Sequence, residues 1–199
     1  MTWNVNQIYD PLSDAELQEE VMRELRTDTE GAGRAIAVYR KNRPKASNLD
    51  LYLIMASDAS VFRTGTDLEA DRKAAQRRAP VYKYYFQWYS PVRGGLLRAM
   101  HTMDVPFAFY NQDVAVSEVG TGVHQLEMAE RHSASIVAFA RTGAPDNHLI
   151  PAWPAYDTSR RATMVMNDDW RVVDNPYGEE KAVIEAVRNR IPPTRRTPT

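Results

Sequence analysis

The first part of the chain repeats apolar residues at the spacing of amphipathic helices. Leu17, Val21 and Leu25 recur at intervals of four, which places them on one face of a helix. Ser13 precedes this stripe as an N-cap, and Glu16 three residues later completes a capping box. The same reasoning predicts three further helices, over residues 30–43, 48–62 and 67–79.

The pattern changes abruptly at residues 79–90, "APVYKYYFQWYS". Aromatic and β-branched residues fill most of this segment without a polar alternation. Such a run is typical of a strand that is buried on both faces, as in the centre of a sheet. We therefore expect a central strand here, followed by loops that lead to the middle of the chain.

The second half predicts fewer elements, again with clear signals at their ends. A long helix is expected over residues 126–143, because Gly143 and Pro145 are typical of a helix end. A two-strand hairpin is expected within residues 151–176, with its turn at "NDD", and a last helix over 178–190. This order favours an α/β fold, helices around a partial sheet with one central strand and a C-terminal hairpin.

Composition narrows the classes of function. The 199 residues are 43% hydrophobic and 26% charged, which is typical of a folded domain. A net charge of −1 argues against binding to nucleic acid or to an anionic membrane. No apolar run is long enough to span a bilayer, and the first residues do not form a secretory signal. The absence of cysteine excludes disulfides, thiolate metal sites and a cysteine nucleophile. These features favour a cytoplasmic protein, although exported bacterial proteins without cysteine share them.

The sequence motifs leave one histidine, His101, as the candidate catalytic residue. The chain has no G-x-S-x-G elbow, phosphate-binding loop, dinucleotide fingerprint or H-E-x-x-H. The four histidines lack metal-ligand spacing, so no metal and no cofactor is expected; His132 and His148 are expected to be solvated. His101 lies in a loop soon after the aromatic strand, where open α/β sheets place functional groups. By its spacing alone, His101 is either a general base or an ordinary surface histidine.

Five segments in order give a more specific indication. They are "APVYKYYF", "MHTMDVPFAF", "VAFARTGAPDN", "WPAYD" and "RRATMVM". From about residue 11 to 184 the chain resembles the C-terminal part of the type B carboxylesterases, the cholinesterase-like α/β-hydrolases that include the para-nitrobenzyl esterases. In that family "MHTMDVPFAF" corresponds to H-A-L-E-I-P-F-V-F, and "VAFARTGAPDN" to A-F-A-R-T-G-x-P-N.

The resemblance implies roles for four residues. His101 stands at the position of the catalytic histidine, which takes the serine proton and passes it to the leaving alcohol. Asp104 stands where the family usually has Glu, and we expect it to be a structural acid that ties down its own loop. Phe107 and Phe109 are expected either to wall an acyl or alcohol pocket or to pack beneath His101.

The resemblance also implies that parts are missing. The family's serine elbow, oxyanion loop and acid precede the matched region, so the sequence is expected to begin just after the acid, with Met1 as an internal methionine. Asp58, Asp113 and Glu118 are not expected to replace that acid. We therefore expect residues 1–188 to be the C-terminal part of a carboxylesterase type B domain and 189–199 a flexible tail. The parent enzyme would act on a small-molecule carboxylic ester.

Three interpretations of such a chain stay open. It is an inactive C-terminal fragment of an esterase, a non-catalytic interaction module derived from the hydrolase fold, or the histidine-bearing half of a split esterase. Its expected partner is the missing N-terminal part or a second copy, because open strand edges favour association. We expect no nucleic-acid or membrane partner.

Overall fold

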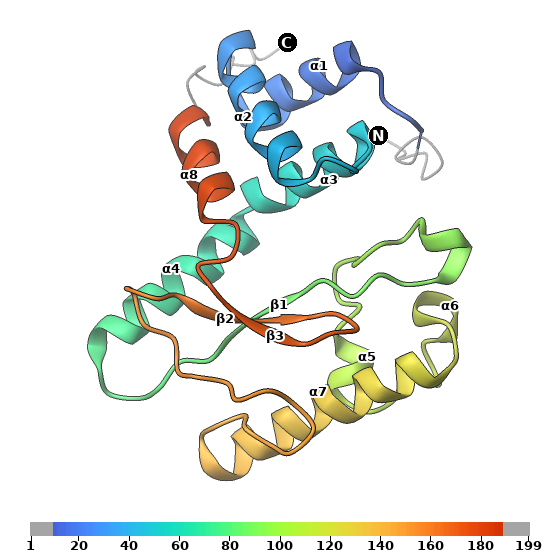
Figure 1. Ribbon diagram of the computed structural model, residues 1–199, viewed down its shortest axis with the longest axis vertical. Coiled ribbons are helices and arrows are strands. Elements are labelled where there is room, and N and C mark those ends of the chain that lie inside the picture. The colour runs from blue at the N-terminus through green and yellow to red at the C-terminus, as the bar shows by residue number, and fades with distance from the viewer. Residues whose placement is uncertain (1–9, 189–199) are drawn as a thin grey trace, which may run out of the picture. The chain divides into compact units, whose positions relative to one another are not determined.

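The computed structural model describes residues 10–188, which divide into two units (Figure 1). The helical unit comprises residues 10–68 and 177–188, and the sheet unit comprises residues 69–176. The tail predicted at 189–199 lies outside the described residues. Helix α4 (Val61–Gln76) begins in the helical unit and ends in the sheet unit.

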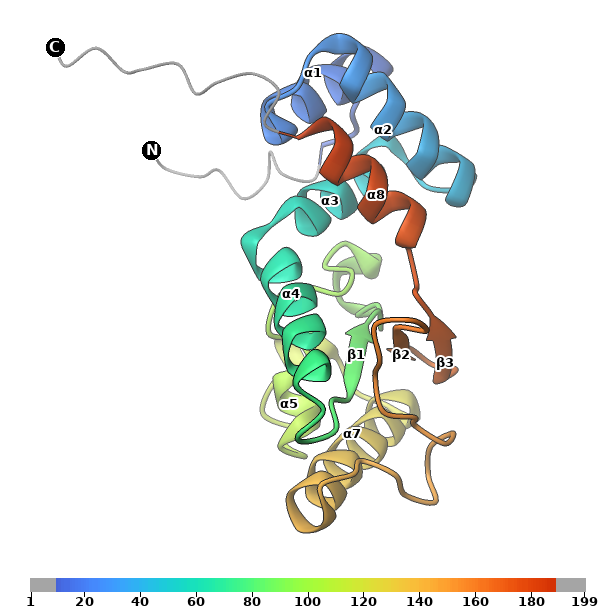
Figure 2. The same cartoon turned by 90° about the vertical axis from the view of Figure 1, so that its left-hand side faces the viewer.

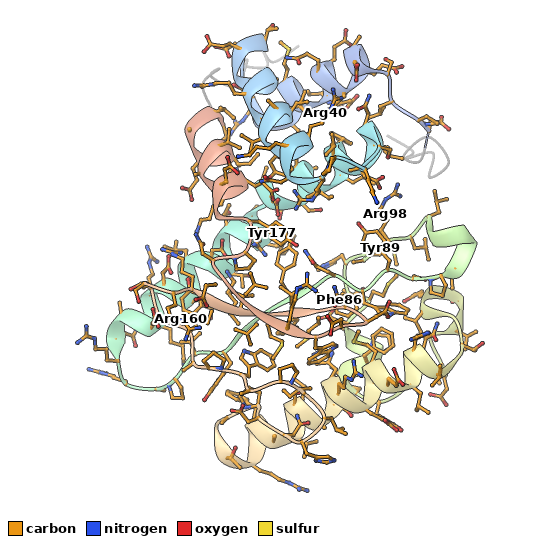
Figure 3. The ribbon with its side chains drawn as sticks, in the orientation of Figure 1. Arg40, Phe86, Tyr89, Arg98, Arg160 and Tyr177 are labelled. Carbon is orange, nitrogen blue, oxygen red and sulfur yellow. The ribbon has the colours of Figure 1, made fainter. Side chains whose placement is uncertain are left out.

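The helical unit contains α1 (Asp14–Leu25), α2 (Thr29–Asn42), α3 (Asn48–Ala59) and α8 (Gly178–Val187). Figures 1 and 2 show α8, from the end of the chain, packed beside α2. The apolar stripe predicted on α1 is buried, and it shares one core with side chains of the other three helices. Arg40 of α2, labelled in Figure 3, donates to Asp14 and to Asn48 and so joins α1 to α3.

Capping explains where these helices begin. The predicted capping box is confirmed, with the Glu16 amide donating to the Ser13 hydroxyl and the Ser13 amide donating to the Glu16 carboxylate. The predicted third helix is too long, because α3 stops at Ala59 and the Ser60 hydroxyl accepts from the Arg63 amide. Ser60 thus caps a new helix, which is why residues 61–62 belong to α4.

The sheet unit is built on three strands in the order β1-β2-β3. β1 (Lys83–Phe86) runs parallel to β2 (Ala162–Met166), and β3 (Arg171–Asp174) pairs with β2 antiparallel. The predicted hairpin is confirmed, and β2, which has neighbours on both sides, is buried along its whole length. The long helix α7 (Val123–Thr142) ends as predicted at Gly143, which has a φ of 79°.

The aromatic strand differs from the prediction. Only residues 83–86 pair as a strand; Tyr84 is exposed and the other three are half-buried, where burial on both faces was expected. Within the described residues β1 pairs only with β2, so it lies at an edge of this sheet. The aromatic composition correctly predicts a strand, and its lack of a second strand neighbour within residues 10–188 agrees with the open strand edges expected of a partial sheet.

The core of the sheet unit lies between the sheet and the short helices that follow β1. These are α5 (Val105–Ala108) and α6 (Val116–Val119), and α5 packs on α7. Trp88, Phe107 and Met128 belong to this core together with Met164 and Met166 of β2. Figure 3 labels Phe86, which packs against this core from β1. The core thus supports the segment 97–111, which contains His101.

Candidate functional site

His101 lies in a tight turn between β1 and α5, with its side chain exposed. The amide of Met103 donates to the carbonyl of Met100 at 3.1 Å, which closes a turn with His101 and Thr102 at its centre. The amide of Val105 then donates to the carbonyl of Thr102 at 3.0 Å and starts α5. The turn therefore presents the imidazole to the outside of this unit.

The backbone of this turn is strained. Thr102 has a φ of 70°, in the left-handed region that glycine adopts easily and a β-branched residue rarely does. Such a residue costs about 1–3 kcal/mol, and it persists only where the surroundings over-determine its conformation. The Thr102 hydroxyl donates to the carbonyl of His101 at 2.5 Å. Strain directly beside a candidate base indicates that the turn is held in a definite shape.

Two anchors hold the turn on its C-terminal side. The Met103 side chain is fully buried in the core of the sheet unit. Beside it, the carboxylate of Asp104 accepts a hydrogen bond from the hydroxyl of Tyr84 at 2.8 Å. Burial raises the pKa of Tyr84, and the charge of Asp104 raises it further, so the phenol stays protonated and remains a donor. Asp104 thus ties its own loop to β1, in agreement with the structural role expected of it.

His132 is a second histidine of this region, and the prediction that it is solvated is wrong. It is only 1% exposed on α7, in phase with the buried positions Gln125, Met128 and Ala129. Its ring meets that of Tyr84 edge-on, with centroids 5.5 Å apart. Among the described residues neither ring nitrogen has a well-formed hydrogen-bond partner. Burial lowers the pKa of His132, and the nearby Asp104 acts in the opposite direction.

The two phenylalanines after His101 have different environments. Phe107 is fully buried, with its ring centroid 5.1 Å from that of Trp88 and 6.1 Å from that of Phe86. Phe109 is 75% exposed. Of the two alternatives left open by the sequence, Phe107 packs in the core beneath the turn, whereas Phe109 is available to line a surface.

The three acids considered as substitutes for the acid of the triad lie on different segments of the chain. Asp58 is buried in the helical unit, where the hydroxyl of Tyr39 donates to it at 2.8 Å. Burial raises the pKa of Asp58, which disfavours the charge that a histidine partner needs. Asp113 is exposed, and Glu118 lies on α6 and is half-buried. These three acids therefore occupy different segments, in a buried, an exposed and a half-buried position respectively.

No group of three or more histidine and acidic side chains within residues 10–188 could hold a metal ion. Over the same residues, no helix combines the length and the apolar character needed to cross a bilayer.

Tyr84 and His132 were missed as neighbours of the histidine turn. The signal for His132 is present in the sequence, since it continues the i, i+3, i+4 and i+7 spacing of the buried face of α7. Tyr84 carries no comparable signal, because six of the nine residues from 81 to 89 are aromatic and nothing marks one of them as the partner of an acid.

Helices around a small mixed sheet make the fold α/β-hydrolase-like. Residues 4–184 match the carboxylesterase family, and the chain belongs to that family. Phenmedipham hydrolase of Pseudarthrobacter oxydans is 33% identical over 105 residues, which are 50% of this chain and 21% of that protein. Carboxylesterase 5A of Felis catus is 32% identical over 91 residues, 42% of this chain and 16% of that protein.

Solved structures agree on the fold. The carboxylesterase EST55 of Geobacillus stearothermophilus at pH 6.2 superposes with a TM-score of 0.68 and is 32% identical; the match covers 91% of this chain and 38% of that one. An esterase of Clostridium hathewayi has a TM-score of 0.68 at 24% identity, covering 88% of this chain and 33% of that one. The chain therefore spans about a fifth of these curated relatives and a third of these structures.

Proposed function

We propose that residues 1–188 form the C-terminal part of a carboxylesterase type B domain, and that His101 is the general base of a serine ester hydrolase. One observation carries this proposal: an exposed histidine sits in a strained, anchored turn at the position that the family resemblance assigns to the catalytic base. Membership of the carboxylesterase family over residues 4–184 supports the same chemistry.

The reaction is hydrolysis of a small-molecule carboxylic ester through an acyl-serine intermediate. His101 accepts the proton of the serine hydroxyl as the oxygen attacks the ester carbonyl, and it returns that proton to the leaving alcohol. Water then attacks the acyl group while His101 accepts a proton from it, and His101 passes this proton back to the serine oxygen as the carboxylic acid leaves. An acid must fix the tautomer of the imidazole, and both it and the serine come from a part of the hydrolase that precedes the matched region.

The open edge of β1 supports a partner that completes the sheet. β1 pairs on one side with β2, and within residues 10–188 its other side has no strand neighbour. The chain also spans only about a third of its structural neighbours. Both facts fit an N-terminal part that supplies further strands, and self-association of β1 is the alternative. Without that part we expect the chain to be inactive and to associate.

The DNA upstream of the Met1 codon separates the alternatives. A continuous reading frame with a G-x-S-x-G elbow and an acid supports the fragment. The same elements on a separate frame support a split esterase, and their absence supports a non-catalytic interaction module.

Hydrolysis of p-nitrophenyl butyrate tests the role of His101. The purified chain is expected to show no turnover alone. Together with the serine-bearing part, it is expected to show turnover that His101→Ala abolishes and that His148→Ala, at an exposed loop histidine, leaves intact. Turnover by the isolated chain that depends on His101 would contradict the proposed division of the triad, and turnover insensitive to His101→Ala would refute the role of the histidine.

A further inference from the structure

We infer that Tyr84 is a positioning residue for His101, because its hydroxyl donates to Asp104 and so ties the histidine turn to the sheet. This inference rests on the proposed role of His101 as the general base. A general base must be held within hydrogen-bond reach of the hydroxyl that it deprotonates, and small misplacements cost much of the rate. The turn is exposed, so its shape depends on contacts made by its flanking residues.

The contact connects the turn to a rigid element. Tyr84 lies within β1, which is in register with β2 through the pair Tyr84–Met164. Asp104 lies three residues after His101, at the first position before α5, and makes no side-chain capping bond to that helix. Its carboxylate therefore serves the long-range contact with Tyr84, twenty residues away along the chain.

The aromatic ring of Tyr84 has two ring neighbours of its own, although the residue is 38% exposed. It packs edge-on against His132, with centroids 5.5 Å apart, and edge-on against Trp153, with centroids 6.5 Å apart. A phenol held in this way has little freedom to follow a moving loop, so its hydroxyl defines where Asp104 must lie. The buried Met103 fixes the same turn from the core, and together the two contacts hold Thr102 at its unfavourable φ of 70°.

Tyr84→Phe is the matched perturbation, because it removes the hydroxyl and keeps both ring contacts. Tyr156→Phe is the control in the same unit, since the Tyr156 hydroxyl also donates to an aspartate, Asp71, at 2.6 Å. The purified chain is labelled with carbon-13 histidine, and its four histidine signals are assigned by single substitutions. The His101 signal is then followed by NMR relaxation, and the Val105 amide by hydrogen exchange.

We expect Tyr84→Phe to broaden or split the His101 signal and to speed exchange of the Val105 amide roughly five-fold, the effect of losing one hydrogen bond. Tyr156→Phe should lower thermal stability by a similar amount and leave the His101 signal unchanged. If the Tyr84 hydrogen bond were merely structural, Tyr84→Phe and Tyr156→Phe would have the same effect on the His101 signal. That result, or an unchanged His101 signal in Tyr84→Phe, would overturn the inference.

A second pair of variants keeps the test decisive if Tyr84→Phe unfolds. Asp104→Asn keeps an oxygen that accepts from Tyr84 and should preserve the ordered His101 signal, whereas Asp104→Ala should reproduce the disorder. Equal disorder in both Asp104 variants would contradict the inference. These measurements need no esterase activity. If the chain together with the serine-bearing part shows no turnover, the proposed function is refuted, and the NMR and exchange data still decide whether Tyr84 positions His101. Where turnover is found, Tyr84→Phe should lower kcat about tenfold or more and leave KM nearly unchanged.

Discussion

Two adjacent glutamates on α8 make a matched test of how burial determines the strength of an ion pair in the helical unit. Glu179 pairs with Lys41 of α2 at 2.8 Å, and its side chain is 50% exposed. Glu180 pairs with Arg43, just beyond α2, and its side chain is 0% exposed. Both pairs connect the same two segments, so Glu179→Gln and Glu180→Gln differ mainly in the solvent around the charge.

The magnitudes follow from that difference. An exposed pair contributes little because solvent screens it, and we expect Glu179→Gln to leave the free energy of unfolding nearly unchanged. Removing one partner of a buried pair costs about 3–5 kcal/mol. Gln still accepts a hydrogen bond, and the guanidinium of Arg43 also lies over the rings of Tyr39 and Tyr177, at 5.4 and 4.8 Å. We therefore expect a smaller loss for Glu180→Gln, of about 2–3 kcal/mol.

Urea unfolding can measure this effect in the unit that contains it. Far-UV circular dichroism reports the helices, most of whose residues lie in the helical unit, whereas three of the four tryptophans, Trp88, Trp153 and Trp170, lie in the sheet unit and make fluorescence report mainly that unit. Glu180→Gln should lower the midpoint seen by circular dichroism more than the midpoint seen by fluorescence. Equal stability of Glu179→Gln and Glu180→Gln would refute the reasoning that burial makes the second pair the stronger one.

Three further predictions concern buried groups. Phe107→Ala should cost about 3–5 kcal/mol of unfolding free energy, whereas Phe109→Ala should change it by about 0.5 kcal/mol or less; equal losses in urea would contradict the different burial of the two rings. Burial raises the pKa of Asp58 in the folded state, so the wild type should lose stability as pH rises from the unfolded pKa through the folded one. Asp58→Asn should therefore become more stable relative to the wild type as pH rises from 3.5 to 7. A difference in unfolding free energy that stays constant over this range would refute the reasoning. Burial lowers the pKa of His132, so the protein should lose stability as pH falls below about 6.5. Urea melts at pH 5 and 7.5 should show that His132→Leu abolishes this loss. His148→Leu, at an exposed histidine, should leave the loss unchanged.

The helices were largely predictable because their signals are local. The capping box of Ser13 and the stop at Gly143 lie within one turn of the ends that they define. The boundary at Ser60 was missed because a serine inside an apolar helical run is compatible both with continuation and with a new N-cap. The extended backbone conformation of Ser60 shows that a new helix begins there, and this conformation is visible only in the structure.

The family resemblance, and not the spacing of residues, singles out His101 as a candidate base. A lone histidine near an aromatic strand is common, and what distinguishes His101 is its strained neighbour Thr102 and the anchor at Asp104. That anchor depends on Tyr84, twenty residues earlier, and a contact of this kind appears only when the strand and the loop are placed together. Periodicity describes one element at a time, so it cannot select one aromatic ring out of several.

The two edges of the sheet differ in the character of their side chains. β3 carries Arg171 and Asp174 at its ends, and Arg160, labelled in Figure 3, holds Asp174 through two hydrogen bonds of 3.0 and 3.1 Å. Charges of this kind protect a natural sheet edge from pairing further. β1 has three aromatic residues after Lys83, a composition suited to burial between neighbours. The contrast between the charged edge at β3 and the aromatic edge at β1 supports the proposed N-terminal part as the partner of β1.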